Sequence, residues 1–309
     1  MERLDSLSGS VTLASGGVAQ TTQQSLTAKG MPANRSVDKF YLKFALTLTR
    51  GVAASEHLGQ AVSEILNRLV ISHGRVNWNV RGNMIYLFDQ IQRLTFNTMN
   101  PVLGSAATEY VFYVPVDPSP VGPPFRKANT FRTEELQNCV FDMTLTCPFD
   151  LVNDVTDLST TVELWASYRP VDPDQKPWVS IFRQQDTFQG NNITINDMVP
   201  ALLIGLGESP TNFDLVTVES SGVRIARGAD MTDLDARDYY YQNVQPVDGP
   251  EIIEGGNQYL RNVPQANGAA QNFHKLFDAR NDPDAALPIV AAYNTIPATF
   301  GYAVKGFGI

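Results

Sequence analysis

The chain has 309 residues, of which 43% are hydrophobic and 18% are charged, and its formal net charge is −9. A chain of this length and composition can bury one large core or two ordinary ones, which argues against global disorder. Folds that hold nucleic acid over a broad face are normally basic, so the acidic balance argues against specific nucleic-acid binding.

The first 36 residues are rich in Ser, Thr, Gln, Gly and Ala and carry few charges. This composition predicts an N-terminal arm over residues 1–36 that is ordered only where another surface holds it, and a floppy terminus is the open alternative. Lys29 and Arg35 are basic spots in this arm. The N-terminus has no apolar run long enough for a signal peptide, so we expect synthesis in the cytosol.

Alternating apolar and polar residues begin at Val37 and predict a long strand over residues 37–49. The next segment, residues 56–71, gives a mixed signal that predicts a short helix followed by a strand. Further strands are expected at 107–116, 139–147 and 160–168. The Pro-rich segment 115–137 is expected to form a long loop that projects from a β scaffold.

Cys139 and Cys147 lie eight positions apart in one of these expected strands. In a straight strand that separation is roughly 26 Å, far beyond disulfide reach. The spacing therefore predicts two reduced, mostly buried thiols.

The segment RPVDPDQKP, residues 169–177, contains three prolines and predicts a stiff linker. It separates residues 37–168 from residues 178–309, and each of these halves has 132 residues. Equal halves on either side of a linker suggest an internal duplication.

The second half repeats the order of signals found in the first. Leu215 lies 146 residues after Leu69, and at this offset Arg81-Gly82 falls on Arg227-Gly228. In each copy an alternating strand runs into Arg-Gly and then into a segment with helical spacing, which predicts short helices at 83–94 and 230–241. The second half is otherwise strand-like with frequent turns, so we expect an all-β protein made of two sandwiches or barrels.

These features resemble the double jelly-roll major capsid proteins of icosahedral viruses with an internal membrane, such as corticoviruses, tectiviruses and the lipid-containing phages of flavobacteria. The segment GRVNWNVRGNMIYLFDQIQRL, residues 74–94, carries the resemblance most closely. The resemblance implies two eight-stranded jelly rolls, with short helices at their contacts and the loop 115–137 as a tower or trimer-contact loop.

The same resemblance implies a non-enzymatic role. It implies pseudo-hexagonal homotrimers that tile the capsid shell of a bacteriophage virion over an internal membrane, after synthesis in the host cytoplasm. The expected partners are further copies of the chain, minor capsid and penton proteins, and the lipid membrane, which Lys29 and Arg35 could contact. No cofactor is expected.

No catalytic residue can be assigned from the sequence. His57, His73 and His274 are far apart, and no nucleophile-elbow motif accompanies them. Glu134 and Glu135 could in principle form a glycosidase pair, but in a polar loop their charge is expected to serve solvation.

Two further groups leave an alternative open. Asp230, Asp233, Asp235 and Asp238 could hold a structural Ca²⁺, although their spacing is not that of an EF-hand and Asp is favoured at helix N-termini in any case. Trp78, Trp165 and Trp178 could stack on sugars, whereas the alternation around Trp78 and Trp165 predicts core packing. The alternative function is therefore a carbohydrate-binding or receptor-binding β-sandwich, as in a spike or adhesin.

Overall fold

The computed structural model describes residues 1–50, 58–82, 85, 108–118, 131–149, 151, 155–171, 178–185, 192–195, 201–207, 215–220, 223–227, 273–277, 289–293 and 299–307. The chain divides into two compact units. The first comprises Met1–Asp89 with Asn97–Trp178, and the second comprises Gln90–Phe96 with Val179–Ile309.

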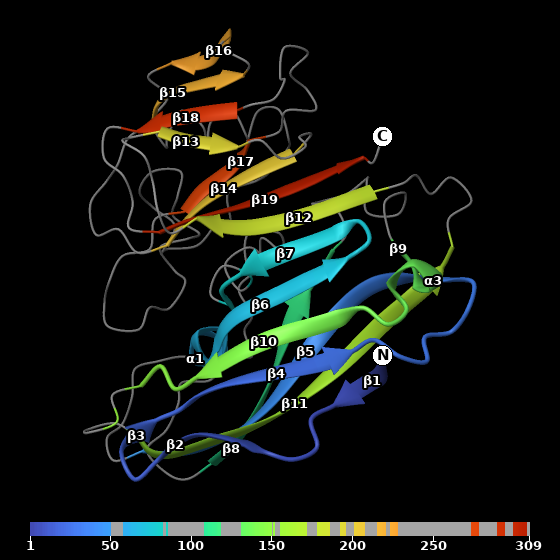
Figure 1. Ribbon diagram of the computed structural model, residues 1–309, viewed down its shortest axis with the longest axis vertical. Coiled ribbons are helices and arrows are strands. Elements are labelled where there is room, and N and C mark those ends of the chain that lie inside the picture. The colour runs from blue at the N-terminus through green and yellow to red at the C-terminus, as the bar shows by residue number, and fades with distance from the viewer. Residues whose placement is uncertain are drawn as a thin grey trace, which may run out of the picture. The chain divides into compact units, whose positions relative to one another are not determined.

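The first unit is built mainly from strands (Figure 1). Its described elements are β1 Glu2–Ser6, β2 Val11–Ser15, β3 Val18–Ala19, β4 Thr21–Thr27, β5 Arg35–Arg50, α1 Leu58–Ile65, β6 Leu66–His73, β7 Val76–Val80, β8 Thr108–Val116, β9 Phe131–Arg132, α3 Thr133–Leu136, β10 Val140–Thr146 and β11 Val155–Pro170.

Eight of these strands form two sheets with jelly-roll connectivity. One sheet has the order β2-β11-β5-β8, and the other has the order β7-β6-β10-β4. If β2, β4, β5, β6, β7, β8, β10 and β11 are numbered one to eight, the sheets read 1-8-3-6 and 5-4-7-2. This order is that of an eight-stranded jelly roll made of two Greek keys. The short strands β3, β1 and β9 lie beside β2, β11 and β5.

The strands from Trp178 onward repeat this connectivity. They are β12 Trp178–Gln185, β13 Asn192–Ile195, β14 Ala201–Gly207, β15 Leu215–Ser220, β16 Val223–Arg227, β17 Phe273–Phe277, β18 Ile289–Tyr293 and β19 Thr299–Phe307. Their orders, β12-β19-β14-β17 and β13-β18-β15-β16, read 1-8-3-6 and 2-7-4-5 when the strands are numbered in the same way. The prediction of an all-β double jelly roll is therefore confirmed.

The predicted repeat corresponds to the same hairpin in both jelly rolls. Leu69 belongs to β6, which pairs antiparallel with β7, and Leu215 belongs to β15, which pairs antiparallel with β16. In each jelly roll this hairpin joins the fourth and fifth strands. The glycine Gly82 lies two residues after the end of β7. The predicted helices 83–94 and 230–241 lie outside the described residues, apart from Ile85.

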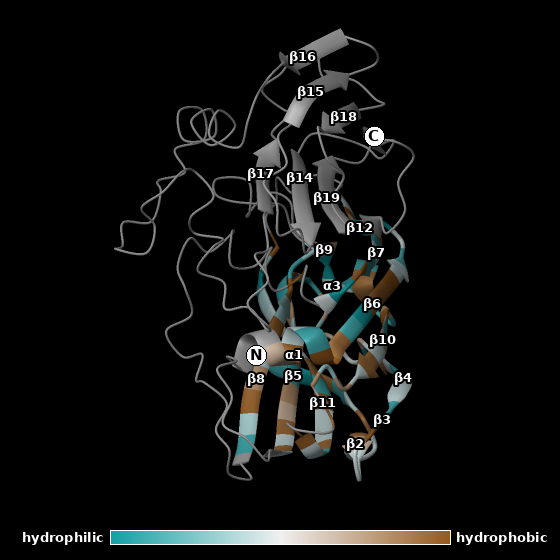
Figure 2. Cartoon of the chain, turned by 90° about the vertical axis from the view of Figure 1, so that its left-hand side faces the viewer, coloured by the Kyte–Doolittle hydropathy of each residue, from teal (hydrophilic) through white to brown (hydrophobic). Residues whose placement is uncertain are grey.

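The core of the first unit lies between its two sheets and follows the alternation of the strands. Every second side chain of β5 from Phe40 to Leu48 is at most 2% exposed. On the facing sheet, Phe141 of β10 meets Phe40 edge to face, with ring centroids 5.0 Å apart. Figure 2 shows hydrophobic and hydrophilic residues alternating along these strands. Each fully buried Leu or Phe contributes about 1.5–3 kcal/mol to folding.

The prediction of an arm over residues 1–36 is wrong, because these residues contain β1 to β4 and the beginning of β5. Strands β2 and β4 are the first two strands of the jelly roll itself, so the first jelly roll begins before Val37 and the halves are not equal. The proposed linker also changes, since Arg169 and Pro170 still pair with Ser36 and Arg35 in β11. Residues 172–177 lie outside the described residues.

Several other sequence expectations can be compared with the structure. The helix-then-strand prediction for residues 56–71 is confirmed by α1 and β6. Cys139 and Cys147 are both free and buried, as predicted, and burial raises the pKa of the Cys139 thiol to about 12. The expected loop 115–137 is shorter than predicted, because β8, β9 and α3 occupy its two ends and only 119–130 lies outside the description. Within the described residues, no helix is both long and apolar enough to cross a bilayer.

Candidate assembly surface

The outward face of the sheet β1-β11-β5-β8 brings together aromatic and charged residues from four strands. In the register of this sheet, Trp165 lies opposite Arg3 on one side and Tyr41 on the other. One step along, Lys43 lies between Glu163 and Tyr113. We call these six residues the outer-face cluster.

Glu163 is the centre of the outer-face cluster. Its carboxylate accepts hydrogen bonds from Lys43 Nζ at 3.0 Å, from Trp165 Nε1 at 2.9 Å and from Arg3 Nη1 at 3.2 Å. Lys43 Nζ also lies 5.8 Å from the centroid of the Trp165 ring, within the range of a cation–π contact. Burial raises the pKa of Glu163, but these three hydrogen bonds outweigh burial and hold the pKa below its ordinary value.

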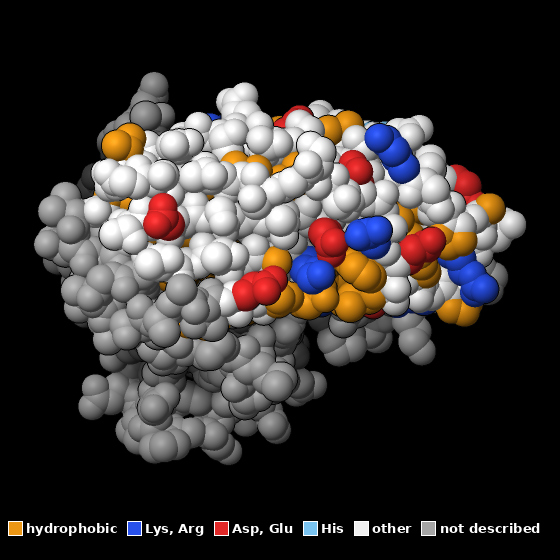
Figure 3. Space-filling view, turned by 90° about the horizontal axis from the view of Figure 1, so that it is seen from below, with side chains coloured by type: hydrophobic (Ala, Val, Ile, Leu, Met, Phe, Trp, Pro, Cys, Tyr) orange, Lys and Arg blue, Asp and Glu red, His pale blue; other side chains and the backbone are white. Residues whose placement is uncertain are grey.

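The cluster continues into an exposed apolar strip on β8. The rings of Tyr41 and Tyr113 meet edge to face, with centroids 6.4 Å apart. Tyr113 is 37% exposed, and Val111, two residues earlier in β8, is 48% exposed. On the part of the described surface shown in Figure 3, apolar side chains lie among acidic and basic ones.

Four of the six residues of the outer-face cluster are of types that are common at protein–protein contacts. Trp, Tyr and Arg are the residues most enriched where binding energy concentrates at interfaces. Glu163 already has partners within its own chain, so a second surface could cover the cluster without leaving that carboxylate unpaired.

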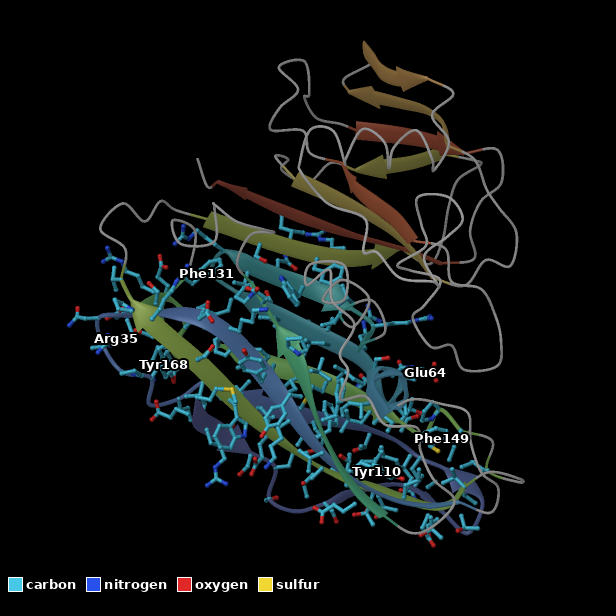
Figure 4. All side chains as sticks on the ribbon, turned by 180° about the vertical axis from the view of Figure 1, so that it is seen from behind. Arg35, Glu64, Tyr110, Phe131, Phe149 and Tyr168 are labelled. Carbon is cyan, nitrogen blue, oxygen red and sulfur yellow. The ribbon has the colours of Figure 1, made fainter. Side chains whose placement is uncertain are left out.

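A second group of polar residues closes one end of the first jelly roll. Arg75, in the turn between β6 and β7, donates to Glu135 Oε1, and the backbone N–H of Arg132 donates to Glu135 Oε2 at 2.9 Å. The guanidinium of Arg75 also lies 5.5 Å from the centroid of the Phe131 ring. Figure 4 shows Phe131 at the same end of the sandwich as Arg35 and Tyr168, and Glu64, Tyr110 and Phe149 at the other end. We call Arg75, Phe131, Arg132 and Glu135 the α3 clasp.

The predicted glutamate pair belongs to this end of the sandwich. Glu134 Oε1 accepts a hydrogen bond of 2.6 Å from the backbone N–H of Asn34, and this bond is the main cause of a lowered pKa for Glu134. Both glutamates lie in α3, not in a loop as predicted, and both accept hydrogen bonds from backbone N–H groups. Their contacts support a structural role.

Only one of the three candidate histidines, His73, has a described side chain. His73, at the end of β6, forms a hydrogen bond of 3.1 Å between Nε2 and the carbonyl oxygen of Glu135. His274 lies in β17, where only the backbone is described, and His57 lies outside the described residues. Within the described part of the chain, no group of three or more His, Cys, Asp or Glu residues could hold a metal ion. The aspartates 230, 233, 235 and 238 lie outside it, so Ca²⁺ there stays a prediction.

The tryptophans differ from one another. Trp78 is 1% exposed, which confirms core packing and leaves its ring no free face for a sugar. Trp165 is only part-buried and lies on the outward face, so the prediction of core packing is wrong for this residue. The side chain of Trp178 lies outside the description.

The outer-face cluster was missed in the sequence. Lys43 and Glu163 are 120 residues apart, and only the register of β5 against β11 makes them neighbours. Tyr41 and Lys43 do occupy the alternate positions of the strand predicted at 37–49. That signal locates an outward face but does not identify the strand beside it.

Solved structures that this chain resembles in fold include viral capsid proteins. The major capsid protein of Sulfolobus turreted icosahedral virus aligns over 97% of this chain and 94% of its own length, with a TM-score of 0.51 and 13% identity. The capsid of the virus PBCV-1 aligns over 97% and 92%, with a TM-score of 0.51 and 10% identity. The major capsid protein P2 of bacteriophage PM2 aligns over 99% and 97%, and its TM-score of 0.49 and identity of 11% add nothing to the assignment.

No family model and no curated protein sequence matches the chain. The likeness therefore concerns the fold, and it covers nearly the whole length of both chains. The resemblance predicted from the sequence is confirmed at this level: the chain is a double jelly roll with the fold of viral major capsid proteins.

Proposed function

We propose that this chain is a major capsid protein. It is a structural subunit of a virion, it forms pseudo-hexagonal homotrimers, and the trimers tile an icosahedral shell over an internal membrane. The observation that carries this proposal is the identical strand order, 1-8-3-6 and 2-7-4-5, of two jelly rolls in one chain.

Duplication has a physical use in such a shell. A trimer of single-domain subunits has three equivalent sides, whereas a trimer of duplicated subunits has six similar ones. Six similar sides allow the trimer to pack in a hexagonal array. A shell also depends on broad contacts between copies and not on a deep pocket.

The outer-face cluster is the surface proposed to hold copies together. It is aromatic and partly exposed, and its charged residues are paired with one another. Such a surface can be covered by a second copy without burying an unpaired charge. A function as a glycan-binding spike is not supported by any described residue, because Trp78 is buried and Trp165 is held by Glu163.

The test is the mass and shape of the purified protein. Light scattering after size-exclusion chromatography should give three times the chain mass of 34.0 kDa, and negative-stain images should show six-sided particles. A monomer that persists at high concentration and binds a glycan array would contradict the proposal.

A matched pair of variants tests the surface. Val111→Asp puts a charge on the exposed strip beside the cluster, and Val140→Asp puts the same charge on β10 of the opposite sheet, where the valine is 38% exposed. We expect Val111→Asp to weaken the trimer at least ten-fold and Val140→Asp to leave it unchanged. If the two variants weaken the trimer equally, the outer-face cluster is not the surface that holds the copies together.

Contact with the membrane is proposed through Lys29, between β4 and β5, and Arg35, the first residue of β5, which are both exposed. Because residues 1–27 contain strands of the sandwich, the test replaces single side chains and leaves the segment in place. Lys29→Ala with Arg35→Ala should reduce flotation with vesicles that contain phosphatidylserine and should leave the trimer intact. Unchanged flotation would show that Lys29 and Arg35 do not contact the membrane. Minor capsid and penton proteins are the further partners that the proposal implies.

A further inference from the structure

Strand β4 ends one side of its sheet and leaves a free edge. It pairs with β10 through seven consecutive residues without a shift in register. On its other side, no strand pairs with it in the described part of the first unit, and β1 and β2 approach it only near its two ends. Figure 2 shows β4 beside β10 at the right-hand margin of the first unit.

The direction of the backbone groups on β4 follows from two hydrogen bonds. The N–H of Ala28 donates to Cys139 on the β10 side at 2.8 Å, whereas the N–H of Thr27 donates to Asp5 Oδ2 at 2.7 Å. Because backbone groups alternate along a strand, the odd-numbered residues of β4 point their N–H and C=O away from β10. Thr21, Gln23 and Ser25 are therefore the residues whose backbone groups lie on the free edge, and all three are exposed.

This edge is closed at both ends. Asp5 already occupies the N–H of Thr27, so pairing cannot extend further toward the end of β4. At the beginning of the strand, the N–H of Gln20 donates to Leu13 at 2.7 Å and turns the chain toward β2. The free edge is therefore limited to Thr21–Ser25, with Gln23 at its centre.

The free edge also lacks the features that normally prevent pairing. Natural proteins protect edge strands by making them very short, by adding charges or proline, or by inserting a bulge. The sequence of β4, TTQQSLT, has no charge and no proline, and its register has no bulge. The edges of the other sheet differ, because β3 has two residues and β8 carries the exposed Glu109 and is contacted by α1.

We propose that β4 pairs antiparallel with β4 of a second copy of this chain. Gln23 lies opposite Gln23 of the second copy, and Thr21 lies opposite Ser25, which gives about six backbone hydrogen bonds across a two-fold axis. Each copy has a net charge of −9, so a contact between copies is favoured where neither strand carries a charge.

This inference rests on the proposed capsid function and adds a contact to it. A two-fold contact cannot relate the three subunits of one trimer, so it joins one trimer to the next. The pairing involves only a few residues on each side and is weak alone, and it becomes effective when many trimers meet in a shell.

The first test changes the edge and leaves the face of the sheet intact. Gln23→Pro removes an N–H that points to the free edge, and proline is tolerated in edge strands at such positions. Gln23→Lys adds a charge at the same place and serves where the proline variant does not fold. The matched control is Thr144→Lys on β10, which lies opposite Gln23 on the same face but on a central strand.

We expect both Gln23 variants to remain folded trimers, and their association beyond trimers in sedimentation velocity to weaken at least ten-fold. Thr144→Lys should associate as the wild type does. If the Gln23→Lys trimers associate normally, the inference is wrong and the proposed function stands. If the wild type forms no trimers at all, the proposed function fails first.

A cross-link tests the register directly. In Gln23→Cys, facing cysteines of two copies would have Cα atoms about 5.5 Å apart, within disulfide range. Oxidation of assembled particles should give disulfide-linked dimers, since the native Cys139 and Cys147 are buried. Thr144→Cys is the control and should give none. Absence of the dimer from Gln23→Cys particles that do assemble would overturn the pairing.

Discussion

At the scale of single residues, Gly82 explains why a strand runs into a glycine before the predicted helix. A Cβ atom at this position would lie 2.5 Å from the carbonyl oxygen of Leu66 and closer still to that of Ser63. The chain after β7 therefore passes directly against the end of α1 and the start of β6. The glycine is required by the close approach of two backbones.

Gly82→Ala should consequently destabilise the first jelly roll by about 3 kcal/mol, at the upper end of the usual cost of overpacking, because the added atom meets backbone and not a movable side chain. The measurement is the midpoint of urea unfolding. Gly74→Ala is the control: its Cβ meets nothing within 4 Å, and only its φ of +56° is unfavourable, at about 1–2 kcal/mol. An equal loss in the two variants would refute the close-approach explanation.

The lowered pKa of Glu163 predicts how the stability of the fold changes with pH. Its pKa in the folded protein is below the ordinary value of 4.5, so its charged form stabilises the fold fully above pH 4.5. As the pH falls below 4.5 through the folded pKa, the carboxylate is protonated and this contribution is lost. Glu163→Gln should therefore be less stable than the wild type at pH 7, and the difference should shrink below pH 4.5.

The readout for Glu163 is the denaturation midpoint measured from pH 3 to pH 7. Glu109→Gln removes the same charge from an exposed position on the same sheet and should leave the profile unchanged. A difference between Glu163→Gln and the wild type that stays constant across this range would show that the charge of Glu163 has no such role.

At the scale of elements, the α3 clasp joins a helix of one turn to the turn between β6 and β7. Glu135 bonds Arg75 through one oxygen and caps α3 at Arg132 through the other. Arg75 Nη1 is buried and has no hydrogen-bond partner, so Arg75 depends strongly on Glu135. Glu135→Ala should cost about 1–2 kcal/mol, since it removes a partly exposed ion pair and a helix cap together.

Hydrogen exchange localises this effect. The amides of residues 132–137 should exchange faster in Glu135→Ala, and those of β5 should not change. Glu135→Gln, which keeps an oxygen for the cap, should retain part of the protection. Uniformly faster exchange over the whole first unit would show that the α3 clasp does not act only on residues 132–137.

The same scale explains which strands could be predicted. The strand at 37–49 was recognised because it is central in its sheet and buries one whole face. Strands β1 to β4 were missed because they lie at or near sheet margins, and β4 buries only Leu26. Hydrophobic alternation appears only where one face of a strand is buried, so a strand that buries a single side chain has no such signal. The outer-face cluster was missed for a related reason, since register is a property of strand pairs and not of a single strand.

At the scale of the whole molecule, the duplication was detected through the order of signals and not through identity of residues. The hairpin of β6 and β7 recurs as β15 and β16 because the fourth and fifth strands of a jelly roll are joined by a short turn, which keeps their spacing nearly constant. Longer connections vary more freely, since loop length costs little free energy. Equal lengths of the two halves were for this reason a misleading guide to where the first jelly roll begins.

Truncation of the N-terminus tests where the first jelly roll begins. A chain without residues 1–10 keeps all eight jelly-roll strands and loses β1, including the bond from Arg3 to Glu163. A chain without residues 1–27 also loses β2 and β4, which uncovers residues 157–160 of β11 and the whole of β10. We expect the shorter deletion to give soluble, folded protein with a lower thermal midpoint. The longer deletion should aggregate, because two unpaired strand edges and the core beneath Leu13 and Leu26 become exposed. Soluble, cooperatively unfolding protein without residues 1–27 would restore the original interpretation of this segment as an arm.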